Sequence, residues 1–380
     1  MKYDSTALKN DGRAKIDMAD DIAHLTPSEA PFVALTKKLT KESATNAEFS
    51  WLDRELEARW DAINNSSGYD SAATSIVVDN GGYFRAGMIV KVPRTGEVIL
   101  ATAVATNTLT VKRGFGETTA AAIVDNDPLL IIGNVNEEGS GAPADAGGNP
   151  TKEYNYTQIF KTPFSVTNTA NAIATYGGKL ITQEQKDKGV LHRIDMERAF
   201  LFGERKEDTT GTHAKRSTRG LVKFLQGSGN VTNISDGSMS KLDFEGWLAG
   251  VFKNGSSQRL LLASPTVIQV IDSWGVNQLQ TVPEANAKYG MHILKYISSH
   301  GELLITKEPL FEGAIYGGYA AAIDLSYIKY KYLDGRDTKL ETNIQAPDVD
   351  GRRDQYITEA GLMVRLPKVH GLHTGVQTAA

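Results

Sequence analysis

The chain contains no cysteine, and it also lacks long apolar runs, an excess of charge of one sign and known catalytic motifs. Without cysteine there can be no disulfide, no thiolate metal ligand and no thiol nucleophile, and this composition fits a reducing compartment. Met1 is followed by polar residues rather than by the apolar core of a signal peptide. No apolar run approaches the roughly 20 residues that cross a bilayer. We therefore expect neither secretion nor insertion into a membrane.

Charge of one sign is not in excess either. The 41 lysine and arginine residues nearly balance the 45 aspartate and glutamate residues, giving a formal net charge of -4 over 380 residues. A basic field typical of nucleic-acid binding is therefore absent, and so is the acidic excess typical of disorder. A hydrophobic content of 41% is ordinary for a folded protein. A chain of this length can bury a sizeable core and usually forms more than one domain.

Catalytic motifs are missing as well. The sequence holds no Walker-type phosphate loop, no strand-linked G-x-G-x-x-G, no G-x-S-x-G elbow and no H-E-x-x-H. The stretch Arg113–Gly116 follows a predicted strand but lacks a third glycine, so we interpret it as a structural turn. No constellation of acid, base and nucleophile stands out. We predict that the protein is not an enzyme and has no catalytic, cofactor-binding or metal-binding residues and no cofactor.

Three histidines are candidates for metal-binding or other functional residues. His370 and His373 lie three residues apart near the C-terminus and could share a metal ion. No third ligand is nearby, so the favoured interpretation is a solvent-exposed tail. His192 falls on a predicted charged helix, where we expect a surface or interface residue.

An acidic stretch near the C-terminus resembles part of a calcium-binding loop. Asp348 and Asp350 open it, and Glu359 falls where such a loop places its bidentate ligand. Arg352 occupies a ligand position, however, and Arg353 stands where the sharp turn needs glycine. These two mismatches favour a charged turn.

The order of the predicted elements is more informative than any motif. Residues 1–24 alternate in charge and hold few large apolar side chains, so they cannot fold alone. They are either a frayed terminus or an arm that becomes ordered on a neighbouring subunit. Thr26 and Glu29 could then form a capping box with Pro27 in the first helical position.

A β-rich module and a long helix follow. Short alternating runs separated by turns predict a small sheet or barrel between about Gly82 and Gly133. The Gly-, Ala- and Pro-rich stretch 136–150 predicts a flexible connection. A charged helix is predicted over roughly Thr182–Glu207, with Gln185 as a capping-box partner. Strands that alternate with helices then indicate a mixed α/β half.

This arrangement resembles the major capsid proteins of tailed bacteriophages, in a subgroup with a β-rich insertion whose members were long catalogued as proteins of unknown function. The similarity covers most of the chain, and its motifs are specific only in combination. They are Leu25–Phe32, Phe49–Trp51, Arg113–Ala120, Val166–Ala170, Glu197–Leu201, Thr218–Leu221 and Ala360–Val364.

The resemblance implies an α+β chain with the Hong-Kong-97-like capsid fold. Its parts would be an N-terminal arm, an extended loop carrying the β-rich insertion, a peripheral domain with a long spine helix, an axial α/β domain, and strands that return to the peripheral domain before a C-terminal tail. The arm is expected at residues 1–45, and the extended loop at 46–150 with its insertion at about 82–133. The peripheral domain is expected at 151–237, with the spine helix at about 182–207. The axial domain is expected at 238–325, and the return strands and tail at 326–380.

The function implied is that of a major capsid protein of a tailed double-stranded DNA phage, self-assembling into pentamers and hexamers of an icosahedral shell around the genome. Its implied partners are copies of itself, a portal, a decoration protein and packaged DNA held non-specifically, with no membrane. We expect any scaffolding protein to be separate, because the arm is short and lacks sustained heptads. The expected location is the virion capsid, assembled in the bacterial host cytoplasm.

One basic cluster could face packaged DNA, because contacts to the DNA backbone need only positive charge. Glu204, Glu207 and Asp208 dilute this cluster, so DNA contact there is disfavoured. The basic residues concerned are Arg205, Lys206, Lys215, Arg216 and Arg219.

Two other functions remain open at the level of sequence. An encapsulin-type compartment shell would share the fold and enclose cargo enzymes. A carbohydrate-binding or adhesion protein could instead use the β-rich module, in which case a fragment of about Gly81–Gly133 would bind glycans by itself.

Overall fold

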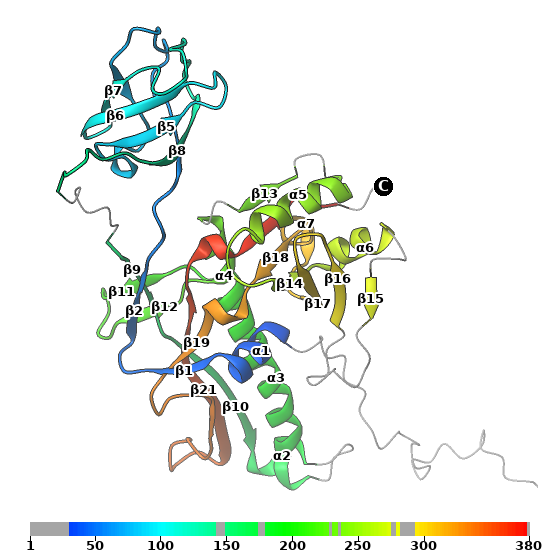
Figure 1. Cartoon of the computed structure of the whole chain (residues 1–380). Coiled ribbons are helices and arrows are strands. Elements are labelled where there is room, and N and C mark those ends of the chain that lie inside the picture. The colour runs from blue at the N-terminus through cyan, green and yellow to red at the C-terminus, as the bar shows by residue number, and fades with distance from the viewer. Residues whose placement is uncertain are drawn as a thin grey trace, which may run out of the picture. The chain divides into compact units, whose positions relative to one another are not determined.

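The computed structural model describes residues 30–141, 149–173, 179–227, 230–234, 237–274, 279–281 and 293–377. The chain divides into two compact units (Figure 1). The larger unit contains the chain up to Trp51 and from Lys152 onward, and the smaller unit is Leu52–Thr151. The α+β class predicted from the sequence is confirmed. Residues 1–29 of the predicted arm, with the capping box at Thr26, lie outside the described residues, and the rest of the predicted arm forms α1 and β1.

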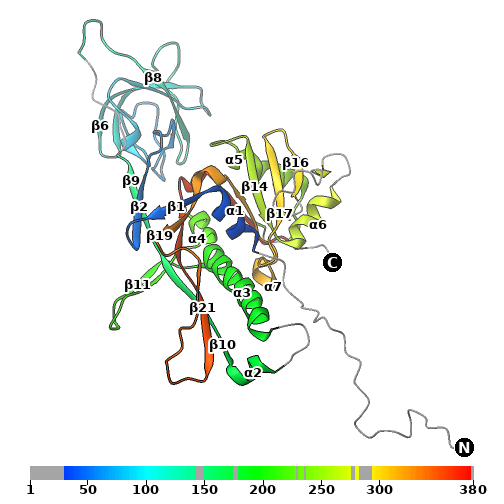
Figure 2. The same ribbon diagram turned by 90° about the horizontal axis from the view of Figure 1, so that it is seen from below.

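The first sheet of the larger unit has five strands. The strand β1 lies parallel to β19, and the remaining pairs are antiparallel, with the short β20 pairing only with β21. The strands β10 and β21 pair over ten residues of each, so they form a long ribbon (Figure 2). In spatial order the strands are β1 (Lys41–Ala44), β19 (Ile328–Leu333), β21 (Gly351–Val364) and β10 (Gln158–Thr167), with β20 (Lys339–Glu341) at the side.

Helices pack on this sheet around one shared core. The long helix α3 contacts β10 and β21, while α1 and α4 contact α3 (Figure 1). The core is rich in aromatic rings, and the rings of Phe160, Phe200 and Tyr330 meet edge to face. The helices are α1 (Pro31–Leu39), α2 (Asn168–Ala172), α3 (Leu180–Phe202) and α4 (Leu221–Gln226).

The long helix is shorter than the predicted Thr182–Glu207. The predicted capping box is wrong, because the helix begins at Leu180 after Lys179, which gives no side-chain cap. The helix ends early because Gly203 becomes extended and meets the backbone of Gly220, whose N–H donates to the Gly203 carbonyl at 2.7 Å. A Cβ on Gly220 would lie 2.5 Å from the Gly203 nitrogen, so the close approach of these two backbone segments requires glycine.

A second sheet of seven strands completes the larger unit. One face of this sheet adds to the first core through residues such as Leu260 and Ile323. The other face forms a second core with Phe244, Leu248, Val267 and Ile271 on the covering helices α5 (Lys241–Val251) and α6 (Pro265–Ser273). The short helix α7 (Gly313–Tyr316) precedes β18. In spatial order the strands are β13 (Val231–Asn233), β22 (Gly371–Thr374), β18 (Ala320–Ile323), β14 (Gln258–Ala263), β17 (Glu302–Lys307), β16 (Ile293–Ile297) and β15 (Leu279–Thr281).

Strands that return to the peripheral domain and then a tail were expected at the C-terminal end, and the structure divides this part of the chain between the two sheets. The strand β21 does join the first sheet, but β22 pairs with β13 and β18 in the second. The reason is burial, because Leu372 and His373 are both fully enclosed in that second sheet. Two small ribbons finish the unit: β2 (Glu48–Asp53) with β9 (Thr151–Tyr156), and β11 (Lys206–Asp208) with β12 (Lys215–Ser217).

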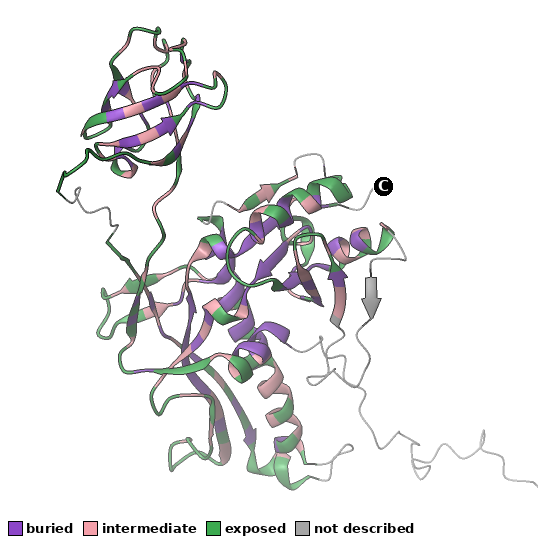
Figure 3. Ribbon diagram, viewed as in Figure 1, coloured by how far each residue is buried: buried purple, intermediate pink, exposed green. Residues whose placement is uncertain are grey.

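The smaller unit is a six-stranded antiparallel sheet around its own apolar core, coloured purple in Figure 3. It begins earlier than the predicted Gly82, because two strands of three residues precede that point. Strands this short show no alternation in the sequence, and their partners lie far along the chain. In spatial order the strands are β3 (Trp60–Ala62), β8 (Pro128–Asn134), β5 (Met88–Lys91), β6 (Val98–Ala105), β7 (Thr108–Lys112) and β4 (Ser75–Val77).

Candidate functional site

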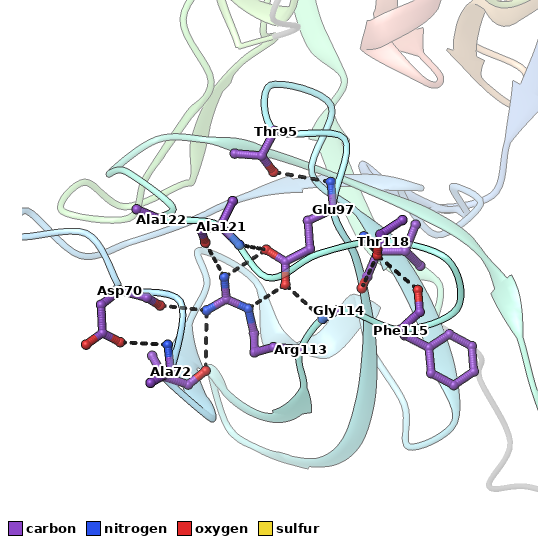
Figure 4. Close-up of polar contacts among 12 residues, drawn as sticks. Asp70, Ala72, Thr95, Glu97, Arg113, Gly114, Phe115, Thr118, Ala121 and Ala122 are labelled. Carbon is purple, nitrogen blue, oxygen red and sulfur yellow. Dashed lines mark hydrogen bonds and ion pairs between the residues drawn. The ribbon is translucent and has the colours of Figure 1, made fainter.

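The turn after β7 is built around a buried ion pair in the smaller unit (Figure 4). Arg113 donates from Nε to Glu97 Oε1 at 2.7 Å and from Nη2 to Oε2 at 2.8 Å. The same carboxylate accepts the backbone N–H of Gly114 at 3.0 Å and of Ala121 at 3.1 Å. Burial alone would raise the pKa of Glu97, but Arg113 and these backbone donors hold it below its usual value.

The remaining donors of Arg113 are also used. Nη1 donates to the Asp70 carbonyl at 2.8 Å, and Nη2 donates to the Ala121 carbonyl. Gly114 and Gly116 adopt φ values of 57° and 75°, which glycine reaches without strain. Arg113 and Glu97 therefore satisfy one another and bind the backbone on both sides of the turn. The interpretation of Arg113–Gly116 as a structural turn agrees with this geometry.

Part of the outer face of the same sheet is apolar, and exposed Lys91 and Lys112 lie beside that part. Trp60 on β3 pairs with Leu130 on the neighbouring strand, and their side chains lie on the face away from the core. Trp60 is 53% exposed and Ile132, two residues beyond Leu130, is 56% exposed. Ile89 and Leu100 continue this face as a cross-strand pair on β5 and β6. An apolar face with this much exposure is typical of a surface that contacts another protein.

In the larger unit, Asn155 joins two of the stretches that carry the family resemblance. Its Nδ2 donates to the Leu362 carbonyl at 2.7 Å and to Thr218 Oγ1 at 3.0 Å. Its Oδ1 accepts the N–H of Arg219 at 2.8 Å and of Tyr156 at 2.9 Å. The side chain is fully buried, so each of these bonds replaces water. The sequence gives no signal for this residue, because most of its partners are 63 to 207 positions away.

The N-terminus of α1 is capped by a residue of another helix. Ala30, at the N-cap, offers no side-chain acceptor. Glu197 of α3 takes that place: Oε1 accepts the N–H of Phe32 at 2.8 Å and Oε2 accepts the N–H of Val33 at 2.7 Å. A negative group is favoured here because the first N–H groups of a helix have no partner within it.

A second buried carboxyl group lies beside Glu197. Glu308, which directly follows β17, accepts the N–H of Leu310 through Oε1 at 3.2 Å. Burial, followed by the charge of Glu308, raises the pKa of Glu197. Burial raises the pKa of Glu308 to about 7. Two carboxyl groups that share a buried site cannot both be ionised without a large cost.

One arginine of the basic cluster near β11 and β12 is paired with a carboxylate, and two others pack on aromatic rings. Arg216 pairs with Glu207 at 2.8 Å. The guanidinium of Arg205 lies 3.7 Å from the centre of the Tyr154 ring and donates to that residue's carbonyl. Arg219 lies over a phenylalanine ring and is half-buried. Lys206 and Lys215 of the same cluster are exposed, and the preference against DNA contact there stays a prediction.

The three histidines are buried, so the expectations of an exposed tail at His370 and His373 and of a surface or interface position for His192 are wrong. Each is 1% exposed or less, and burial lowers the pKa of each to about 4. His192 bridges Thr162 and Thr358, and His370 accepts the backbone N–H of Asp324. The tail is enclosed because its last strand, β22, lies inside the second sheet with strands on both sides.

The acidic stretch does not converge on a metal ion. Asp348 and Asp350 are exposed in the connection before β21, whereas Glu359 lies within β21 and pairs with Arg336 at 2.6 Å. Arg352 is held by Asp354. The turn is confined to the residues before Gly351, and the prediction is wrong for Arg352, Arg353 and Glu359, which pair with β10 within β21. Within the described ranges, no group of three or more His, Asp or Glu side chains is placed to hold a metal ion.

None of the helices in the described part of the chain has the length and hydrophobicity of a membrane-spanning segment.

Comparison with known proteins identifies the family. The family model of the SU10 major capsid protein matches residues 2–377. The major capsid protein of Pseudomonas phage PaMx41 is 27% identical over 324 residues, which cover 82% of this chain and 77% of that protein.

Solved structures give weaker similarities. One from Mycobacterium phage Bobi has a TM-score of 0.49 at 9% identity and covers 95% of each chain. The SrpI encapsulin of Synechococcus elongatus has a TM-score of 0.44 at 12% identity, over 61% of this chain and 78% of that one. Both TM-scores are below 0.5, so the assignment rests on the sequence matches. The predicted resemblance to tailed-phage major capsid proteins is confirmed, and the chain belongs to the SU10 major capsid protein family.

Proposed function

We propose that this major capsid protein assembles, as pentamers and hexamers, into a closed icosahedral shell around the double-stranded DNA of a tailed phage. The observation that carries the proposal is the family match over residues 2–377. The structure supports it in one further respect: buried charges in the described part are engaged with one another or with backbone, and an exposed apolar face is left on the smaller unit. Such surfaces bind other proteins rather than small substrates.

Electron microscopy of the full-length purified chain tests this proposal. We expect closed shells, formed by the chain alone or with a co-expressed scaffolding protein. The contents distinguish a phage capsid from a cargo-filled compartment, because a capsid packages DNA and an encapsulin packages enzymes. Monomers or small oligomers under every condition would contradict the proposal.

The parts of the chain are proposed to correspond to those of the Hong-Kong-97-like fold. Residues 1–45 would form the arm, and 46–150 the extended loop, whose β-rich insertion comprises the sheet from Trp60 to Asn134. The peripheral domain would contain the first sheet and the spine helix α3. The axial domain would be the second sheet, extended at its edge by β13 and β22.

The proposed partners are a separate scaffolding protein, a portal, a decoration protein and packaged DNA bound without sequence preference. Assembly is proposed to take place in the host cytoplasm. Purification of shells from infected cells, followed by mass spectrometry, tests the protein partners. Shells that form and fill with DNA in the absence of any scaffold would contradict a separate scaffolding protein.

A further inference from the structure

The carboxyl groups of Glu197 and Glu308 meet where α1 begins, at the start of the described chain. Both residues are 0% exposed. They come from different elements, since Glu197 is in the middle of α3 and Glu308 directly follows β17. Because Glu197 holds the first N–H groups of α1, the pair connects three segments that are far apart in the sequence.

The hydrogen bonds around this pair leave one buried oxygen, Glu308 Oε2, that could carry a proton. Both oxygens of Glu197 already accept a backbone N–H, as a carboxylate does. Glu308 Oε1 accepts the N–H of Leu310, whereas Glu308 Oε2 is buried and has no donor among the described residues. A proton on Oε2, directed at Glu197, would give this oxygen its partner and remove the repulsion between two buried negative charges.

We propose that Glu197 and Glu308 form a proton-controlled latch on the N-terminal helix. With one proton shared between the two carboxyl groups, α1 stays attached to α3. Loss of that proton places two negative charges side by side away from water, and the attachment of α1 weakens.

Other charged groups near the pair do not replace the proton. A cavity of about 380 Å³ lies next to Glu308, and Arg198 of α3, Lys307 of β17 and Glu312 before α7 line it. The ionisable groups of α1 itself are at its other end, where Lys37 pairs with Asp337. The start of α1 also lines this cavity, so solvent protons can reach the pair at the point where the helix would detach.

The direction of the pH effect follows from the shift at Glu308. Burial raises the pKa of both members of the pair, that of Glu308 from 4.5 to about 7, so above about pH 4.5 the closed state holds a proton that the open state has lost. The contribution of this proton to the stability of the closed state is therefore fully present below about pH 4.5 and is lost as the pH rises through about 7.

Hydrogen exchange of the full-length chain tests the latch at Phe32 and Val33, whose N–H groups Glu197 holds. After correction for the intrinsic exchange rate, opening of α1 should rise about tenfold per pH unit between about pH 5 and about pH 7 and then level off. In Glu308→Gln the amide donates to Glu197 and cannot titrate, so the opening should change by less than about twofold over the same range.

Glu312→Gln is the matched control, because Glu312 lines the same cavity but is exposed. It removes the same charge and should keep the wild-type slope. An unchanged slope in Glu308→Gln, or a flat wild-type profile, would overturn the proposal.

Infrared spectroscopy of the wild-type chain provides a test that needs no variant. A buried protonated carboxyl band should be present at about pH 6 and lost by about pH 8.5. Its absence at the lower pH would also overturn the proposal.

Discussion

Arg259 and Asp324 form an ion pair that is closed off from solvent, with Arg259 Nη1 2.8 Å from Asp324 Oδ2. Arg259 lies on β14 and Asp324 follows β18, and these strands are neighbours in the second sheet. The side chains are 0% and 6% exposed. A buried pair of this kind contributes little relative to an apolar pair, but loss of one partner leaves an unpaired charge in the core.

Asp324→Ala should therefore lower the free energy of unfolding by about 3–5 kcal/mol, as measured by urea denaturation. The double variant Arg259→Met with Asp324→Leu should recover most of that loss, because no charge remains buried. Glu302→Gln breaks the exposed pair with Lys295 and should leave the denaturation midpoint unchanged. If Asp324→Ala is as stable as the wild type, Arg259 is solvated and the prediction is wrong.

The buried histidines should make the subunit sensitive to acid. Burial lowers the pKa of His192, His370 and His373 from 6.5 to about 4, so the unfolded chain binds protons that the folded chain excludes. Their contribution to stability is fully present above about pH 6.5 and is lost as the pH falls towards about 4. The melting temperature should decline over this range.

His373→Phe is the most direct variant for this effect, because neither ring nitrogen of His373 has a partner in the described part of the chain. The ring packs edge-on against Trp247, and phenylalanine preserves that contact. The slope of melting temperature against pH should become shallower. His300→Gln, at an exposed position, should keep the wild-type slope. Identical slopes in all three proteins would exclude His373 as a source of acid sensitivity.

The ion pair of Glu97 and Arg113 should control the stability of the smaller unit. Glu97→Ala leaves Arg113, which is 5% exposed, without its carboxylate and should cost about 3–5 kcal/mol. Limited proteolysis of the full-length chain should then cleave within Leu52–Thr151 first. Arg94→Ala removes a partly exposed pair with Asp127 and should have a smaller effect. Equal protease resistance of Glu97→Ala and wild type would contradict this prediction.

The apolar outer face of the smaller unit is predicted to bind a second copy of this chain. Trp60→Ser combined with Ile132→Ser should leave the melting temperature of the isolated subunit nearly unchanged, because both side chains are more than half exposed. The yield of closed shells should fall at least about tenfold, measured by sedimentation. Val124→Thr, at another exposed position in the same unit, is the control. Normal shell yield in the double variant would show that this face lies outside any required contact.

Much of the organisation of the chain could be predicted from the sequence, because local patterns encode it. Alternation predicted the strands around Met88–Lys91, and turn residues predicted the structural role of Arg113–Gly116. Helical spacing located the body of α3, although its ends were wrong by two residues at the start and five at the end. The resemblance to phage capsid proteins depended on the order of these parts and is confirmed by the family match.

What the sequence determined by itself was therefore the order of the main elements, the absence of thiol chemistry and the family. The tertiary structure alone decided which residues meet. Glu197 and Glu308, Asn155 and Leu362, and the enclosure of His373 by neighbouring strands all join positions that are far apart in the chain. Contacts of this kind leave no period or spacing in the sequence, because burial and the pairing of distant backbone segments create them only after the chain has folded.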